Sequence, residues 1–179
     1  MTVSEGTRAS LLDVAARAVQ AMQAGELDDF QRLVHPKAVN REDVVEPPAA
    51  RVGGPEAFLA SAHWLRGAFS DLRFVIEDAA ADGDLTILRV TMSGRHTGPF
   101  VVYGADARVD RVFAPTGRSF AVHQTHWQRI RDGRVIEHWA DRDDQGMAMQ
   151  AGWIPPSPLY LIRCARATAR ARRDQANRR

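Results

Sequence analysis

Residues 118–141 read RSFAVHQTHWQRIRDGRVIEHWAD, two segments in which apolar and polar residues alternate on either side of Asp132-Gly133. Alternation is typical of β-strands with one buried face, and an Asp-Gly pair is typical of a tight hairpin turn. The pattern predicts strands over 118–131 and 134–141. On the first strand, the face that we expect to point into the protein carries Val122, Gln124, His126, Gln128 and Ile130.

The length of this turn decides which residue of the second strand lies opposite His126. A two-residue turn pairs His126 with Trp139, whereas a three-residue turn with a bulged glycine pairs it with His138. In the second arrangement, His138 and Ala140 share one side of the sheet with His126.

The segments before the hairpin change from a helical to a strand period. Apolar residues recur at helical spacing over 8–24, 27–34 and 55–69, and residues 41–54 form an irregular connection suited to a cavity mouth. Beyond residue 70 the period is two, which predicts strands over 72–79, 84–95, 97–103 and 108–114. Helices followed by strands predict an α+β fold, in which a curved antiparallel sheet is wrapped by the N-terminal helices and encloses a pocket.

Charge is distributed unevenly along the 179 residues. Seven arginines and one aspartate from residue 163 onward give this segment a net charge of +6, which leaves −4 for residues 1–162. A terminal arginine block is more typical of a solvated segment than of a nucleic-acid-binding face. We expect one domain over 1–162 and a basic C-terminal tail over 163–179 whose composition permits disorder, with no nucleic-acid partner. An RNA or membrane role for the tail is the weaker alternative.

Several classes of site lack a sequence signal. Cys164 is the only cysteine, and His123 and His126 are spaced for opposite faces of a strand, so neither a disulfide nor a metal site is expected within the chain. Glycine-rich phosphate loops, nucleophile elbows and dinucleotide fingerprints are missing from the sequence. No stretch approaches ~18 consecutive apolar residues, and the first residues are polar. These features predict a cytoplasmic protein that uses no cofactor and has no membrane partner.

Two glycine-bearing segments have the sequences Gly94-Arg95-His96-Thr97-Gly98 and Ala114-Pro115-Thr116-Gly117-Arg118. They resemble the paired strands of one family, the SnoaL-like polyketide cyclases of the nuclear-transport-factor-like and ketosteroid-isomerase-like superfamily. Their hairpin and terminal helix are similar to residues 126–139 followed by Asp143, Gly146, Gln150 and Gly152. Together with His35-Pro36, Asn40 and residues 54–58, the resemblance covers about residues 8–153. It implies a cone-shaped fold, an apolar pocket for a polyketide-like molecule and a homodimer, and it favours the pairing of His126 with His138.

Two departures from the family pattern bear on function. The stretch Val101–Arg111 is longer than the usual turn, which predicts a reshaped pocket rim. The family's ester cyclases use a carboxylate as acid and base near a histidine of the preceding strand, and aligning His126 with that histidine places Ala140 where the carboxylate belongs. The ester-cyclase mechanism therefore does not carry over directly. A non-catalytic binding or assembly protein of the same fold is the alternative to an enzyme.

The predicted chemistry is proton transfer without a cofactor, leading to cyclisation, isomerisation or hydration of the substrate. Ring closure by an intramolecular aldol step requires removal of a proton from a carbon between carbonyls and stabilisation of the enolate. Histidine titrates in the needed range, and burial raises the pKa of a carboxyl toward it. We predict His126 as the acid or base, supported by Asp143 and His138.

Each of these residues also has a structural interpretation. Asp143 is well placed as the N-cap of a helix over 144–151, and His126 can be a hydrogen-bonded core histidine. His96 and His123 are expected at the surface or on the opposite face of the sheet. The residues that we expect to bind substrate are Trp64, Trp139, Gln124, Phe58 and Asn40.

Overall fold

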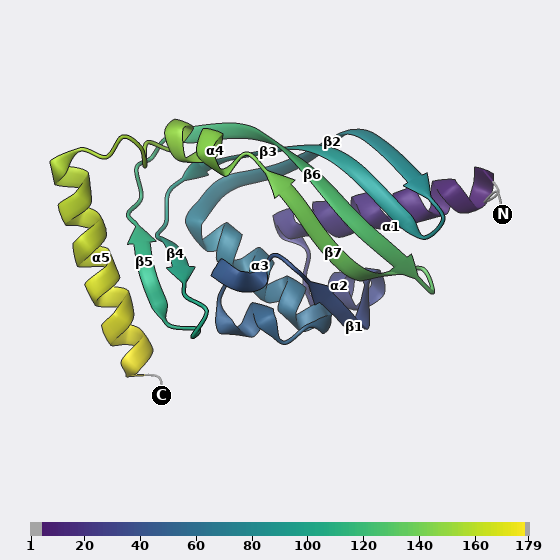
Figure 1. The fold of residues 1–179 in the computed structure, drawn as a ribbon, viewed down its shortest axis with the longest axis horizontal. Coiled ribbons are helices and arrows are strands. Elements are labelled where there is room, and N and C mark those ends of the chain that lie inside the picture. Colours follow the sequence, from purple (N-terminus) through teal and green to yellow (C-terminus); the bar gives the residue numbers. More distant parts are fainter. Residues whose placement is uncertain (1–4, 178–179) are drawn as a thin grey trace.

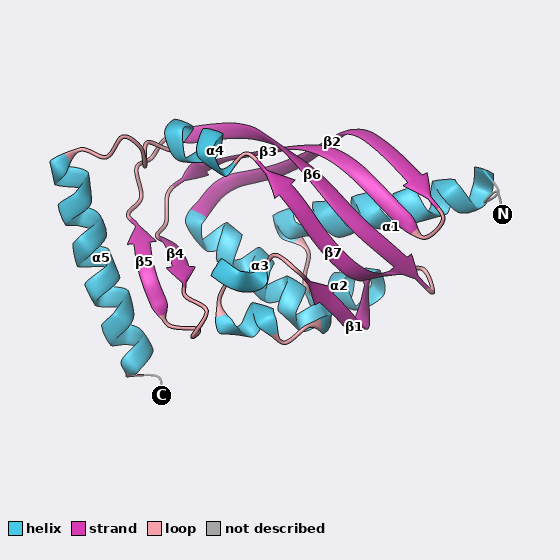
Figure 2. Ribbon diagram, in the orientation of Figure 1, coloured by secondary structure: helices cyan, strands magenta, loops and turns pink. Residues whose placement is uncertain are grey.

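A five-stranded sheet bends over three helices in the computed structural model, which describes residues 5–177 (Figures 1 and 2). The strand order is β1-β7-β6-β3-β2, antiparallel except for the parallel pair of β1 and β7. The strands are β1 (Val34–Asn40), β2 (Phe69–Asp82), β3 (Leu85–His96), β6 (Ser119–Arg131) and β7 (Arg134–Arg142). The helices beneath them are α1 (Glu5–Ala24), α2 (Leu27–Leu33) and α3 (Gly54–Ala68). The predicted α+β cone is confirmed.

The sheet curves because its edge strand β2 is irregular. The pairing of β2 with β3 shifts register between Ser70 and Arg73 and again between Ile76 and Asp78. Asp71, within the first irregularity, has a positive φ of 54°. Bulges of this kind bend a strand and increase its twist, so the concave face of the sheet can wrap around the helices.

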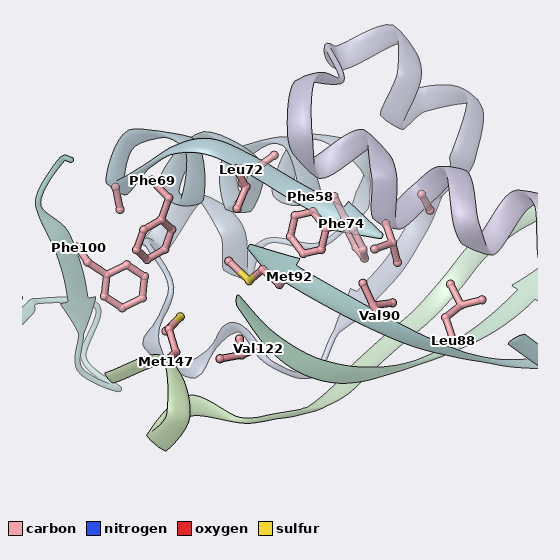
Figure 3. Close-up of a cluster of buried hydrophobic side chains, with 14 of the residues drawn as sticks. Phe58, Phe69, Leu72, Phe74, Leu88, Val90, Met92, Phe100, Val122 and Met147 are labelled. Carbon is pink, nitrogen blue, oxygen red and sulfur yellow. The ribbon is translucent and has the colours of Figure 1, made fainter. Parts of the chain in front are cut away.

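Apolar residues from both layers form the core between sheet and helices. Figure 3 shows Phe58 of α3 together with Phe74 and Met92 of the sheet, and Phe69 beside Phe100. The predicted alternation of β6 is confirmed, because its buried residues are Phe120, Val122, Gln124, His126, Gln128 and Ile130. This strand therefore sends three polar side chains into an otherwise apolar interior.

Both predicted pairings of His126 are wrong. The turn does have two residues, with positive φ at Asp132 and Gly133 as a type I′ turn requires, and Arg131 lies opposite Arg134. A register shift at Arg129/Ile130 then adds one residue to β7, so that His126 lies opposite Ala140. Because the shift is one residue from the simple two-residue register, His138 still shares a side with His126.

Strand β1 was not predicted. The helical spacing over 27–34 predicted a helical turn through Val34, but residues 34–40 pair in parallel with β7. Proline is tolerated here because β1 is the edge strand of the sheet. The strand brings Asn40 opposite His138.

The β4–β5 hairpin (Phe100–Tyr103 and Val109–Phe113) occupies the longer stretch noted in the sequence and stands at one end of the cone. Helix α5 (Pro158–Ala176) packs along β5 on its outer side (Figure 1). The remaining helix, α4 (Asp144–Gln150), follows β7. The hairpin and α5 thus extend the fold beyond the five-stranded sheet.

Residues 163–176, expected to form a basic tail, belong to α5, and their arginine side chains are exposed. One face of α5 supplies partners to the unpaired edge of β5. Val112 N–H donates to Thr168 Oγ1 (2.9 Å), Val109 N–H donates to Gln175 Oε1 (3.0 Å), and Arg172 Nε donates to the Val109 carbonyl (3.0 Å). These contacts satisfy edge groups that would otherwise need water. Residues 178–179 lie outside the described residues.

Candidate active site

An apolar cavity of about 340 Å³ lies between the concave face of the sheet and the helices. This volume is within the ~300–1,000 Å³ that small-molecule sites typically occupy. Its walls are mainly aromatic and aliphatic, and the polar or charged side chains among the lining residues are Asn40, Glu46, Ser61, Gln124, His126, Gln128, His138, Arg142 and Asp144. The site therefore combines an apolar wall with a small set of titratable groups.

A row of close polar contacts connects several of these polar groups across three strands. His126 Nε2 lies 2.9 Å from Gln124 Oε1, and His126 Nδ1 lies 3.0 Å from His138 Nε2. His138 Nδ1 lies 2.9 Å from Asn40 Oδ1. Phe74 and Phe58 present aromatic contacts to His126 and His138, respectively. The two imidazoles are thus held by polar partners at both ends and by aromatic rings at the sides.

The backbone determines which ring nitrogens carry protons. Glu42 N–H donates to Asn40 Oδ1 (3.2 Å), so that oxygen is fixed as an acceptor, and His138 Nδ1 must donate to it. A neutral imidazole has a single N–H, so His138 Nε2 accepts the proton of His126 Nδ1. In the neutral state the lone pair of His126 is consequently at Nε2, facing Gln124 Oε1, and these two atoms share a proton only when His126 is protonated. Neutral His126 can therefore accept a proton only at Nε2.

Burial keeps both imidazoles uncharged at neutral pH. It lowers the pKa of His126 to about 4, and the positive charge of Arg142 acts in the same direction. Burial also lowers the pKa of His138 well below its usual value, followed by the effects of His126 and Arg142. If Nε2 of His126 takes a proton, Gln124 Oε1 is already placed to accept a hydrogen bond from it. Burial and Arg142 therefore favour the neutral base at rest, whereas Gln124 Oε1 favours the protonated form.

Glu46 is the site residue that sequence reasoning missed. It follows the short 3₁₀ helix η1 (Asp43–Val45), is 5 % exposed and lines the cavity. Ser61 Oγ of α3 hydrogen-bonds one carboxyl oxygen, and Asn40 Nδ2 lies 3.5 Å from the other. Arg51 holds this turn through the Glu46 carbonyl (2.9 Å). Burial raises the pKa of the Glu46 carboxyl, against the lowering effects of Ser61 and Arg142.

The predicted binding residues divide into two groups. Trp64, Phe58, Gln124 and Asn40 line the cavity, and Trp64 is fixed there by a hydrogen bond from Nε1 to the Val101 carbonyl (2.8 Å). Trp139 does not line it. Its ring stacks on Trp127 and lies under the Arg41 guanidinium, on the face of the sheet that points away from the helices.

Asp143 is also outside the cavity lining. Its carboxylate accepts a hydrogen bond from Gly146 N–H (2.7 Å) as the N-cap of α4, and the residue is exposed. The helix-capping interpretation therefore describes its contacts, and we leave Asp143 out of the catalytic set proposed below.

The two remaining strand histidines have different environments. His123 is exposed on the outer face, as predicted. His96 is fully buried, which contradicts the surface prediction, because β3 ends beneath α4 and the chain that follows it. Trp153 Nε1 donates to His96 Nδ1 (3.0 Å), and burial lowers the pKa of His96 to about 4. This histidine belongs to the core rather than to the cavity lining.

Among residues 5–177, no group of three or more His, Cys, Asp or Glu side chains is arranged to hold a metal ion. In the same part of the chain, no helix has the length and hydropathy needed to cross a membrane.

Sequence comparison identifies the family to which this fold and cavity belong. The profile of the SnoaL-like polyketide cyclases matches residues 13–151. The chain belongs to the SnoaL-like polyketide cyclase family. The resemblance inferred from the sequence motifs is thereby confirmed. Aklanonic acid methyl ester cyclase DnrD of Streptomyces peucetius is 32 % identical over 148 residues, which cover 82 % of this chain and 94 % of the relative.

Further relatives agree with this assignment. Nogalonic acid methyl ester cyclase of Streptomyces nogalater is 30 % identical over 138 residues, covering 75 % of this chain and 91 % of the relative. The solved structure of IdmH from Streptomyces antibioticus has a TM-score of 0.59 at 26 % identity, covering 79 % of this chain and 98 % of IdmH. TsrD from Streptomyces laurentii has a TM-score of 0.65 at 24 % identity, covering 84 % and 98 %. This SnoaL-like chain therefore shares the fold and approximate extent of its relatives.

Proposed function

We propose that this SnoaL-like protein is a polyketide cyclase that closes a carbon ring of a flat, polyketide-derived substrate by acid/base catalysis. The observation that carries the proposal is the position of His126, whose Nε2 lone pair is held beside an apolar cavity by the row His126–His138–Asn40. A base in this position can remove a proton from a carbon between carbonyls, and the walls can hold the two reacting carbons near each other.

The lining suits a polycyclic ligand with a few polar substituents. Trp64 and Phe58 offer aromatic surface for a flat ring system. Gln128 Oε1 is buried in the wall and has no hydrogen-bond partner among the described residues, so it can accept a hydrogen bond from a ligand hydroxyl. Arg142 adds a positive charge that stabilises an enolate. These groups support a hydroxylated polyketide as substrate.

The two esters on which the relatives act provide the test. Purified protein is incubated with aklanonic acid methyl ester and with nogalonic acid methyl ester, and products are separated by chromatography and identified by mass spectrometry. Intramolecular ring closure yields an isomer of unchanged mass. Failure to bind and to convert either ester would overturn the proposal.

A matched pair of histidine variants tests the proposed base. His126→Ala should lower kcat by about 100-fold or more, the usual scale for loss of a general acid or base. The control is His123→Ala, which removes an exposed histidine from the opposite face of the same strand and should leave kcat within about twofold. Equal activity of the two variants would remove His126 from the mechanism.

The alternative function is that of a non-catalytic binding protein. It draws support from Ala140, which lies opposite His126 and carries no acid or base. Under this alternative, both histidine variants bind the esters and neither they nor the native protein converts them. Homodimer formation and a cytoplasmic location remain predictions.

A further inference from the structure

We propose that Glu46 is the proton donor of the reaction, acting with His126 at the polar edge of the cavity and replacing the carboxylate that Ala140 cannot supply. This inference rests on the proposed function and adds a second catalytic residue to it. Its basis is the position of the Glu46 carboxyl in the cavity wall and the pattern of its hydrogen-bond partners.

The partners of Glu46 serve both of its protonation states. The Ser61 hydroxyl has one proton and two acceptors within reach, the Glu46 carboxylate and the Ala57 carbonyl (3.2 Å). When the carboxyl is ionised, Ser61 can donate to it. When the carboxyl is protonated, Ser61 can donate to Ala57 and accept from Glu46. A purely structural carboxylate needs only the first of these arrangements.

The charged and polar groups around Glu46 come from four elements. Asn40 of β1 and Ser61 of α3 hydrogen-bond the carboxyl, Asp43 of η1 contributes a negative charge, and Arg142 of β7 contributes a positive charge. The guanidinium of Arg142 is itself engaged by Glu42 (3.1 Å). Burial is the largest influence and raises the pKa of Glu46, which favours the acid form at rest.

Burial therefore shifts Glu46 toward its neutral acid form and His126 toward its neutral base form. A pair of titratable groups with such environments is the arrangement expected for acid/base catalysis. His126 and Glu46 are connected through His138 and Asn40, so both belong to one polar edge of the cavity. The two groups can act on different atoms of one bound substrate.

The aldol step balances with these two residues alone. The proton on the substrate carbon moves to His126 Nε2, and the electron pair left behind forms the new carbon–carbon bond to the acceptor carbonyl carbon. The π pair of that carbonyl moves to its oxygen, which takes the proton of Glu46. The product is an isomer of the substrate, and return of a proton from His126 to Glu46 restores the resting site. No oxidant, reductant or co-reactant is consumed.

The first experiment compares Glu46→Gln with Glu56→Gln, which changes an exposed glutamate in the first turn of α3. With aklanonic acid methyl ester, Glu46→Gln should lower kcat by about 100-fold or more, and Glu56→Gln should leave it within about twofold. The native kcat should fall as pH rises through the pKa of Glu46, because the acid form is consumed, and Glu46→Gln should lose this limb. An unchanged kcat and pH profile in Glu46→Gln would overturn the assignment.

The second experiment does not depend on turnover. Infrared spectra of the native protein recorded at increasing pH should contain the C=O band of a neutral carboxylic acid that persists above the pH range of an ordinary glutamate, and Glu46→Gln should lack it. Absence of the band from the native protein overturns the assignment of Glu46 even if the native protein is active. An inactive native protein that binds neither ester instead overturns the proposed function, so the two failures are distinguishable.

A further variant covers the case in which Glu46→Gln does not fold. Ser61→Ala retains the carboxyl but removes one of its partners, so it should shift both the infrared band and the alkaline limb of the kcat profile. Circular dichroism establishes that each variant is folded. If Ser61→Ala changes neither the band nor the limb, the proposed role of Glu46 is wrong.

Discussion

Buried His96 should make the stability of this protein fall in mild acid. In the native state its pKa is lowered from 6.5 to about 4 by burial. Between these two pH values the unfolded chain binds a proton at this position and the native state does not, so the free energy of unfolding decreases as pH falls. From pH 7.5 to pH 4.5, the contribution of His96 to this loss is about 2.5 kcal/mol.

The measurement is urea unfolding at both pH values, followed by circular dichroism, for the native protein and His96→Gln. Glutamine keeps an acceptor for Trp153 Nε1 and does not titrate. The native protein should lose about 2.5 kcal/mol more than His96→Gln between the two pH values. The contributions of His126 and His138 occur in both proteins and cancel in the difference. His123→Gln, an exposed control, should behave as the native protein does.

Any cost of the substitution itself also cancels, since each protein is compared with itself at two pH values. The reasoning would be refuted if the unfolding free energies of the native protein and His96→Gln decreased in parallel, within about 0.5 kcal/mol. In that case the native His96 would take up its proton as readily as an exposed histidine does.

Three further outcomes are expected. Trp64→Ala should weaken binding of aklanonic acid methyl ester, measured by calorimetry, about tenfold because an aromatic contact is lost. Trp139→Ala, which changes a residue on the outer face, should leave the affinity within about twofold. Gly98→Ala should lower the free energy of unfolding by about 2 kcal/mol or more in urea titrations, because the added Cβ would overlap the Gly67 carbonyl. Removal of residues 158–179 should increase the rate of proteolysis within the β4–β5 hairpin, because the edge of β5 loses its hydrogen-bond partners on α5. Cleavage no faster than in the full chain would contradict this prediction.

The sequence predicted the features that depend on local periodicity. Alternation placed Gln124, His126 and Gln128 on the inner face of β6, and burial of this face is what the pattern encodes. The partner of His126 was not predictable in the same way. It depends on an extra residue in β7 beyond a two-residue turn, and alternation carries no mark of such a bulge.

Glu46 was missed because its burial comes from tertiary contacts. The segment around it has no strand or helix period, and Glu46 is buried where the chain after η1 meets Ser61 of α3 and Asn40 of β1. The available signal was its apolar setting, since Val44-Val45 precede the glutamate and Pro47-Pro48 follow it. A charged residue within such a run is a candidate for burial.

Helix α5 was missed for a different reason. The arginine content of residues 163–179 suggested solvation, and this outweighed a helical spacing that was present in the sequence. Tyr160, Cys164 and Thr168 recur at intervals of four, and all three contact the β5 strand or the residue after it. The net charge reflects the arginines on the outer face of α5 and does not indicate the other face, which packs against β5.

The polar edge of the cavity argues for chemistry over simple binding. Each buried polar group costs free energy unless it is hydrogen-bonded, and an apolar wall of the same shape would avoid that cost. A scaffold or passive carrier for a flat aromatic ligand has no need of two imidazoles and a carboxyl in contact through Asn40. Proton transfer does need them, in neutral forms and beside the ligand. The family resemblance places Ala140, which lies opposite His126, at the usual carboxylate position, and in the proposed mechanism the turn that bears Glu46 supplies the acid instead.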